Sequence, residues 1–72
     1  MSSGFFSVRK HIGLNIRGLR EARSWFQSDL AKAAGLPVRT IGRIERGEVD
    51  VRLSTLRRVA KSLGINLKKL LP

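Results

Sequence analysis

Apolar residues near the N-terminus recur with the spacing of an amphipathic helix. The spacing begins near His11, and the apolar side chains follow at steps of four and three residues, at Ile12, Ile16 and Leu19. Gly13 and Gly18 weaken this helix, because each costs about 1 kcal/mol relative to Ala in a helix interior. We therefore expect a first helix that depends on tertiary packing for its stability.

Two shorter helices with a Gly-containing turn between them come next. The segment QSDLAKAAG has apolar residues at helical spacing and ends at Gly35, which suits a left-handed C-terminal stop. The segment LPVRTIGRIERG predicts a third helix, with Pro37 in its first turn and Gly47 as its stop. The connection from Gly35 to Pro37 has the length and character of a helix-turn-helix connection.

Two further helices are expected towards the C-terminus. Apolar residues follow helical spacing up to a stop at Gly64, at Leu53, Leu56, Val59, Ala60 and Leu63. A last short helix over residues 67–71 follows, with Asn66 as its cap. No stretch alternates apolar and polar residues for long enough to make a strand. The pattern predicts an all-α domain of five short helices over residues 11–72, after an N-terminal extension, residues 1–10, that is either flexible or at a dimer contact.

The third expected helix separates into two faces of different chemistry. Ile41, Ile44 and Glu45 share one side. The opposite side consists of three arginines around one glycine, namely Arg39, Gly42, Arg43 and Arg46. Because the planar fork of Arg matches guanine edges or phosphate, this face favours a groove over mere solvation. Gly42 either permits close approach of a partner or has drifted at an exposed site.

Glu45 is the only acid in the third helix, and it lies on the inward-facing side. An acid at the edge of the core needs a positive partner to offset its desolvation. Arg20, on the first helix, is the partner that we expect.

The charge narrows the partner to a polyanion. The chain has 72 residues, with 15 Lys and Arg against 5 Asp and Glu, and a formal charge of +10. This density points to nucleic acid first and an anionic membrane surface second, with solubility as the neutral alternative. No apolar run approaches the roughly 20 residues that span a bilayer, and the N-terminal residues lack a secretory signal. We expect a cytoplasmic protein of prokaryotic or phage origin, associated with the nucleoid.

The residues that support metal or covalent chemistry are scarce. The chain has no Cys and a single histidine, His11, which excludes disulfides and thiolate sites and cannot assemble a zinc site alone. No His stands beside a nucleophile and an acid, so we expect no enzyme, no metal, no cofactor and no small-molecule substrate. A partner subunit remains the natural supplement to a small core.

Three segments resemble the XRE family of helix-turn-helix regulators, which includes the phage lambda and Cro-type repressors. They are IRGLREAR, QSDLAKAAGLPVRTIGRIERG and LSTLRRVAKSLGINLKKLL, and together they cover most of the chain, from about Ile16 to Leu71. The middle segment is the specific one, with Gln followed by Leu-Ala, Gly, Ile and Arg-Ile-Glu-Arg-Gly. The resemblance implies a compact lambda-repressor-like fold that binds double-stranded DNA.

The resemblance also implies roles for individual residues, with the third helix in the major groove. Base contacts are implied for Val38, Arg39, Thr40, Gly42 and Arg43. Phosphate contacts are implied for Gln27, Ser28, Arg46, Gly47 and Arg52. The N-terminus of the second helix, at Gln27, favours an anion in any case. Arg20 and Glu45 match a pair that many members join as a buried salt bridge.

The sequence departs from the family pattern at three caps. Phe26 replaces the usual Ser or Thr before the glutamine, so either Ser24 or a water caps the second helix, or its start is looser. Pro37 stands where Ser or Thr commonly caps the third helix, and Arg52 replaces a common Ser. We expect Phe26 to be partly exposed, near the DNA backbone or a neighbouring subunit. Trp25 takes the place of a core leucine and is expected in the core.

Members of this family typically bind as twofold dimers to operators of the same symmetry. We therefore expect a repressor or autoregulator that binds a palindromic operator as a homodimer. The candidate dimer contacts are Leu67, Leu70, Leu71 and the Phe5–Phe6 segment, unless Leu67 and Leu70 complete the monomer core. The alternative function is an antitoxin that binds a toxin protein and represses its own operon. The lack of Tyr and of an aromatic pair on a sheet speaks against RNA binding.

Overall fold

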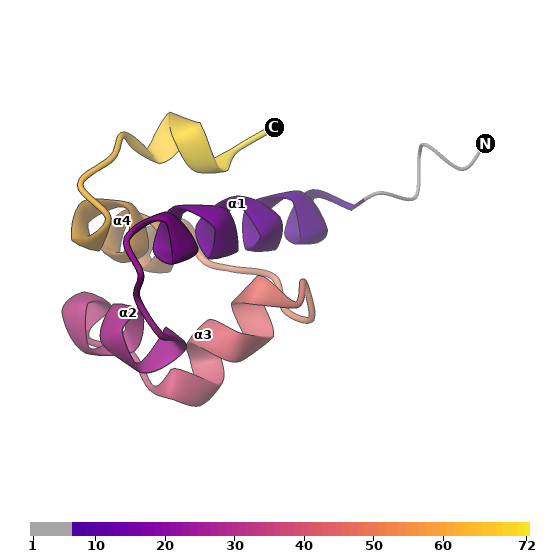
Figure 1. Cartoon of the computed structure of the whole chain (residues 1–72). Coiled ribbons are helices and arrows are strands. Elements are labelled where there is room, and N and C mark those ends of the chain that lie inside the picture. Colours follow the sequence, from indigo (N-terminus) through magenta and orange to yellow (C-terminus); the bar gives the residue numbers. More distant parts are fainter. Residues whose placement is uncertain (1–6) are drawn as a thin grey trace.

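The computed structural model describes residues 7–72 and shows α2 and α3 on one side of α1, with the C-terminal turn on the other (Figure 1). The elements are α1 (Val8–Ala22), α2 (Gln27–Ala34), α3 (Val38–Glu45), α4 (Leu53–Ser62) and a 3₁₀ turn, η2 (Leu67–Leu70). Over these residues the chain forms no strand, which confirms the predicted all-α fold. None of these helices has the length and apolar character needed to cross a membrane.

The first helix begins earlier than the sequence predicted. It starts at Val8 rather than near His11, because the hydroxyl of Ser7 accepts a hydrogen bond from the Lys10 N–H at 3.2 Å and so caps the first turn. Residues 8–10, which were predicted to belong to the N-terminal extension, thus form the first turn of α1. The Phe5–Phe6 segment, proposed as a dimer contact, lies outside the described residues.

The last element is a single 3₁₀ turn, so the described chain has four α-helices rather than the five that were predicted. The predicted cap is confirmed, since the Asn66 side chain accepts from the Lys68 N–H at 2.9 Å. Leu71 has an extended backbone, with φ −95° and ψ 152°. The ring of a proline disfavours the α conformation of the residue before it, so Pro72 keeps Leu71 from extending the turn into a helix.

The elements share one hydrophobic core. The most deeply buried large side chains are Ile16, Leu30, Ile41, Ile44, Val59, Leu63 and Leu70. Leu70 is fully buried and completes the monomer core, whereas Leu67 and Trp25 are half-buried against it. Leu71 remains 39% exposed. Leu53, the first apolar residue of the predicted fourth helix, is also the first residue of α4 and is 60% exposed.

Candidate nucleic-acid interface

The turn between α2 and α3 fixes the direction of the candidate recognition helix. Gly35 has a left-handed φ of 69°, as predicted for the end of α2, and the Leu36 N–H donates to the Ala31 carbonyl at 2.9 Å. Arg58 of α4 donates to the carbonyls of Ala34 and Gly35 at 3.2 and 2.7 Å. Because α4 holds the end of α2 in this way, it also holds the start of α3.

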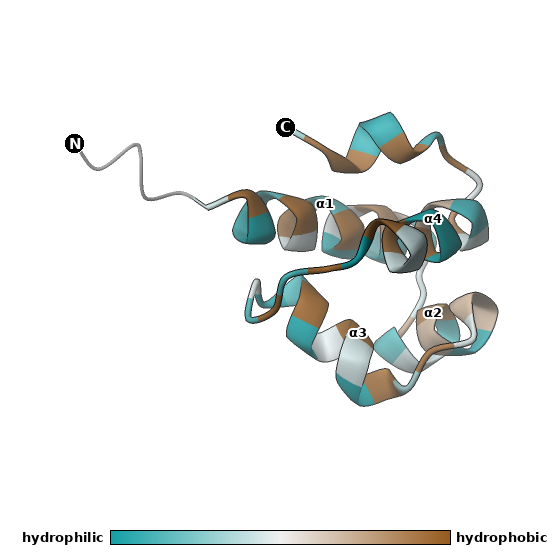
Figure 2. Ribbon diagram, turned by 180° about the vertical axis from the view of Figure 1, so that it is seen from behind, coloured by the Kyte–Doolittle hydropathy of each residue, from teal (hydrophilic) through white to brown (hydrophobic). Residues whose placement is uncertain are grey.

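The ribbon of α3 alternates between hydrophobic and hydrophilic residues (Figure 2). Its inward side is buried as predicted, with Ile41, Ile44 and Glu45 1%, 2% and 7% exposed. The three arginines of its outward side, Arg39, Arg43 and Arg46, are exposed. Val38 is 47% exposed at the start of the helix. The helix therefore presents an arginine face to solvent while its other face is fixed in the core.

Gly42 does not lie open on this arginine face, and its predicted exposure is wrong. The residue is buried, and a Cβ added to it would lie 3.1 Å from Nη1 of Arg46 and 3.4 Å from Oε1 of Gln27. Both side chains are predicted phosphate ligands, from two different helices. The absence of a side chain at Gly42 therefore makes room for Arg46 and Gln27 to converge.

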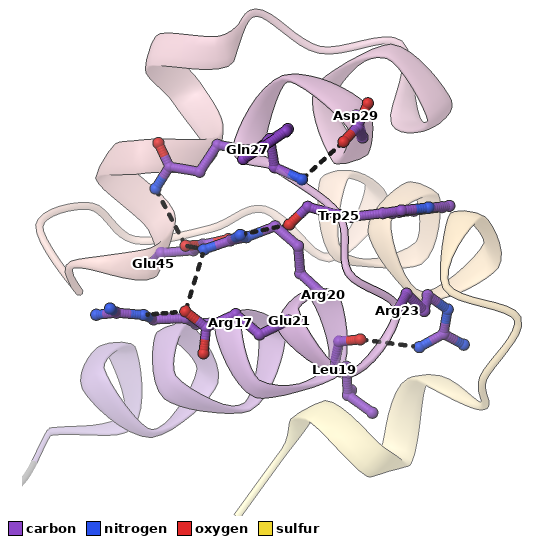
Figure 3. A network of polar contacts seen from close by, with 10 residues as sticks. Arg17, Leu19, Arg20, Glu21, Arg23, Trp25, Gln27, Asp29 and Glu45 are labelled. Carbon is purple, nitrogen blue, oxygen red and sulfur yellow. Dashed lines mark hydrogen bonds and ion pairs between the residues drawn. The ribbon is translucent and has the colours of Figure 1, made fainter.

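Glu45 joins the core to Gln27 through a buried network (Figure 3). Nε and Nη2 of Arg20 donate to the two carboxylate oxygens of Glu45 at 2.6 and 2.9 Å, which confirms the predicted pair. Nη1 of Arg20 donates to the Trp25 carbonyl at 2.7 Å. The hydrogen bond to Glu45 raises the pKa of the Arg20 guanidinium above its ordinary value. Nε2 of Gln27 donates to Oε1 of Glu45 at 3.1 Å, so the same carboxylate orients the amide of Gln27.

Arg46, the C-cap of α3, forms an ion pair with Glu48 in the loop that follows. Nε donates to one carboxylate oxygen at 2.8 Å and Nη2 to the other at 3.3 Å. These hydrogen bonds from Arg46 lower the pKa of the Glu48 carboxyl below its ordinary value and raise that of the Arg46 guanidinium. Glu48 is therefore charged at neutral pH.

The other predicted contact residues are distributed over α2, α3, the loop after α3 and the start of α4. Ser28 is exposed in the first turn of α2, and Gly47 has a φ of 70° directly after Arg46. Thr40 and Arg52 line the same shallow cavity, of about 150 Å³, between α3 and the start of α4. Arg52 is exposed and is the N-cap of α4, where it has no side-chain cap hydrogen bond.

Lys10 of α1 is a residue at this site that the sequence pattern missed. Its Nζ donates to the Arg46 carbonyl at 3.4 Å, and a Cβ on Gly47 would lie 2.7 Å from its Cγ. Lys10 thus fixes α1 against the end of α3. Only its charge could have drawn attention to it, because it lies outside the helix-turn-helix segment.

The N-terminus of α2 is closed by Asp29, and not by Ser24. Its carboxylate accepts from the Phe26 N–H at 2.7 Å, which is the half of a capping box that an N-cap Phe can still form. Phe26 is 76% exposed, in agreement with its predicted exposure, and lies next to Gln27 in the chain.

A helix that exposes a row of arginines and follows a short, glycine-containing turn after another helix is the arrangement of a helix-turn-helix DNA-binding domain. The chain belongs to the HTH_3 family, described as Helix-turn-helix, whose model matches residues 16–70, and the resemblance to XRE-type regulators is thereby confirmed.

Similar proteins include a control protein, a restriction-modification controller protein and a bacterial transcriptional regulator. The chain is 37% identical over 67 residues to control protein C.SmaI of Serratia marcescens, covering 93% of this chain and 80% of that protein. The crystal structure of the restriction-modification controller protein C.AhdI from Aeromonas hydrophila superposes with a TM-score of 0.85 at 32% identity, covering 88% of this chain and 96% of that one. The transcriptional regulator SutR of Escherichia coli is 30% identical over 59 residues, 82% of this chain but only 33% of SutR. These relatives are named as regulators and controllers, and the chain is a transcriptional regulator with a helix-turn-helix DNA-binding domain.

Proposed function

We propose that this chain recognises a specific double-stranded DNA sequence by placing α3 in the major groove. The exposed arginine face of α3, fixed from behind by the buried Arg20–Glu45 pair, carries this proposal. The proposed base contacts are Val38, Arg39, Thr40 and Arg43, and the proposed phosphate contacts are Gln27, Ser28, Arg46, Gly47 and Arg52. Gly42, for which the resemblance also implied a base contact, is buried beneath the side chains of Gln27 and Arg46. Gln27 and Arg46 converge beside Gly42, so they would hold the same stretch of backbone.

The length of α3 supports a dimer as the binding form. A helix of eight residues is about 12 Å long and reaches few base pairs. Two copies related by a twofold axis place their recognition helices about 34 Å apart, one turn of the duplex, and so double the contacts. Leu71, 39% exposed, and the half-buried Leu67 supply apolar surface for this contact, whereas Leu70 has none left.

The proposed role is that of a repressor or autoregulator in the manner of a restriction-modification controller. Two features of the similarity support it. The chain covers 80% of the length of C.SmaI and 96% of that of C.AhdI. The helix-turn-helix match itself, residues 16–70, accounts for most of this chain.

Selection from a random library of DNA duplexes tests this function directly. We expect the selected sequences to converge on a palindrome whose half-sites lie about one helical turn apart, because a twofold dimer reads both with the same helix. Sequencing of the bound fraction after several rounds is the measurement. A library that shows no enrichment would contradict sequence-specific recognition, and a single unrepeated half-site would contradict the dimer.

Substitutions of the α3 arginines and of Gln27 in α2 distinguish base contacts from phosphate contacts. We expect Arg43→Ala and Arg39→Ala to cost about 1–3 kcal/mol of binding and to relax the preference at the base pairs that they contact. Gln27→Ala should instead weaken binding to all sequences alike, because phosphates are common to all of them. Competition between the selected duplex and single-base variants measures the preference. If Arg43→Ala left the preference unchanged, the proposed orientation of α3 would be wrong.

A further inference from the structure

Glu48 is a carboxylate beside two proposed phosphate ligands, Arg46 and Gly47. It lies in the loop directly after α3, next to Gly47, and its exposed side chain is paired with Arg46. A negative charge at this place opposes binding to a polyanion, since like charges a few ångströms apart repel. Its presence there calls for a role other than contact with DNA.

The geometry of the pair shows what the carboxylate occupies. Both oxygens of Glu48 accept from the Nε and Nη2 edge of Arg46, at 2.8 and 3.3 Å. That edge is the fork with which Arg binds a carboxylate or a phosphate equally well. Only the Nη1 end of Arg46 is directed towards the space above Gly42, beside Gln27.

We propose that Glu48 occupies Arg46 in the absence of DNA as an intramolecular substitute for phosphate, and thereby sets the affinity of the chain for the DNA backbone. This inference rests on the proposed DNA binding by α3. When a backbone phosphate binds the Nε and Nη2 edge of Arg46, it displaces the carboxylate from that edge, and the loss of the ion pair subtracts from the binding free energy. The effect is the same for every DNA sequence, because it concerns phosphate alone.

Two other exposed ion pairs involve arginines outside the outward face of α3. Glu21 accepts from Nε of Arg17 at 3.1 Å within α1, and Asp50 accepts from Nε of Arg9 at 2.7 Å. Glu21 is the better control, because it has the same side chain as Glu48, a similar exposure and an arginine partner that lies outside α3. A substitution there removes the same charge without freeing a proposed phosphate ligand.

The test compares Glu48→Gln with Glu21→Gln in the full chain. Binding is measured at several salt concentrations to the selected duplex and to a duplex of scrambled sequence. We expect Glu48→Gln to bind both duplexes about two- to fivefold more tightly at low salt, the range set by an exposed ion pair, and the gain to shrink as salt screens the charges. Glu21→Gln should change binding much less, and equal thermal unfolding of the two variants would show that folding is not the cause.

A double-mutant cycle with Arg46→Ala identifies the route. In the Arg46→Ala background we expect the gain from Glu48→Gln to fall to that of Glu21→Gln, because no fork remains to be freed. If the gain persisted there, or if Glu48→Gln bound no more tightly than the unaltered chain, the inference would be overturned while the proposed function stood. If the unaltered chain bound neither duplex, the proposed function would be overturned together with it.

Discussion

Replacing Glu45 by Ala is expected to destabilise the fold by about 3 kcal/mol or more, because removal of one partner of a buried ion pair strands the other charge. Arg20 is 8% exposed and directs two of its three nitrogens at the carboxylate, at 2.6 and 2.9 Å. Without Glu45, its remaining contacts are the Trp25 carbonyl and the rim carboxylate of Glu21, whose Oε2 is 3.9 Å from Nη2. Urea unfolding followed by circular dichroism measures the loss.

Two matched variants test whether the loss of stability comes from an unpaired buried charge. Glu21→Ala breaks the exposed pair with Arg17 and the longer contact, 3.9 Å, with Arg20, and should cost only about 1 kcal/mol or less, the usual range of exposed pairs. The double variant Arg20→Met with Glu45→Leu should be more stable than Glu45→Ala alone, since no buried charge remains unpaired. Equal losses for Glu45→Ala and Glu21→Ala would contradict a buried, strongly coupled pair.

The same carboxylate also concerns DNA binding, because Gln27 donates to Glu45 at 3.1 Å. Part of any loss of affinity in a Glu45 variant will therefore come from a disordered Gln27 amide. Loss of folded protein is the other cause. Comparison of Gln27→Ala with the double variant Arg20→Met/Glu45→Leu, at a temperature where both are folded, separates the effect of the Gln27 amide from that of unfolding.

Helical periodicity was sufficient to predict the Arg20–Glu45 pair. It placed Glu45 on the core side of α3 and left Arg20 as the expected partner, because desolvation of a lone acid is unfavourable. The glycines predicted the ends of α2 and α3 correctly. Gly35 and Gly47 have positive φ values of 69° and 70°, a conformation that terminates helices through local chemistry. These features depend on residues near in sequence or on a single helical face.

The features that periodicity missed depend on the approach of distant segments. Gly42 shares a helical face with the arginines, yet the side chains of Gln27 and Arg46 cover it. Asp29 accepts a hydrogen bond from the Phe26 N–H, and Lys10 reaches the carbonyl of Arg46 from α1. None of these contacts follows from the spacing within one helix, because each needs the relative position of two elements or a choice among competing local acceptors.

Gly13 shows this most clearly. From the sequence it only weakens the first helix, yet the structure gives it a specific role at the crossing of α1 and α3. A Cβ built on Gly13 would lie 2.5 Å from the carbonyl oxygens of both Ile44 and Glu45, and 2.9 Å from the Glu45 carbonyl carbon. These are backbone atoms of α3, so they cannot rotate away as a side chain would. Gly13 therefore allows the backbones of α1 and α3 to touch.

Gly13→Ala is accordingly expected to destabilise the fold by about 1–3 kcal/mol, the usual cost of overpacking, despite the better helix propensity of Ala. Gly18 is the matched control in the same helix, because a Cβ there meets nothing within 4 Å. Gly18→Ala should stabilise the fold by up to about 1 kcal/mol, since only the propensity changes. Urea unfolding of the two variants should thus shift in opposite directions.

The Gly13→Ala substitution should also affect the proposed DNA-binding face. The atoms that a methyl group on Gly13 would strike belong to the last turn of α3, directly before Arg46, so α3 must move away from α1 to admit that group. We expect Gly13→Ala to lose affinity for the selected duplex even at temperatures where it is fully folded, whereas Gly18→Ala keeps the affinity of the unaltered chain. If Gly13→Ala proved as stable as Gly18→Ala and bound the duplex equally well, the close backbone contact between α1 and α3 would not exist in solution.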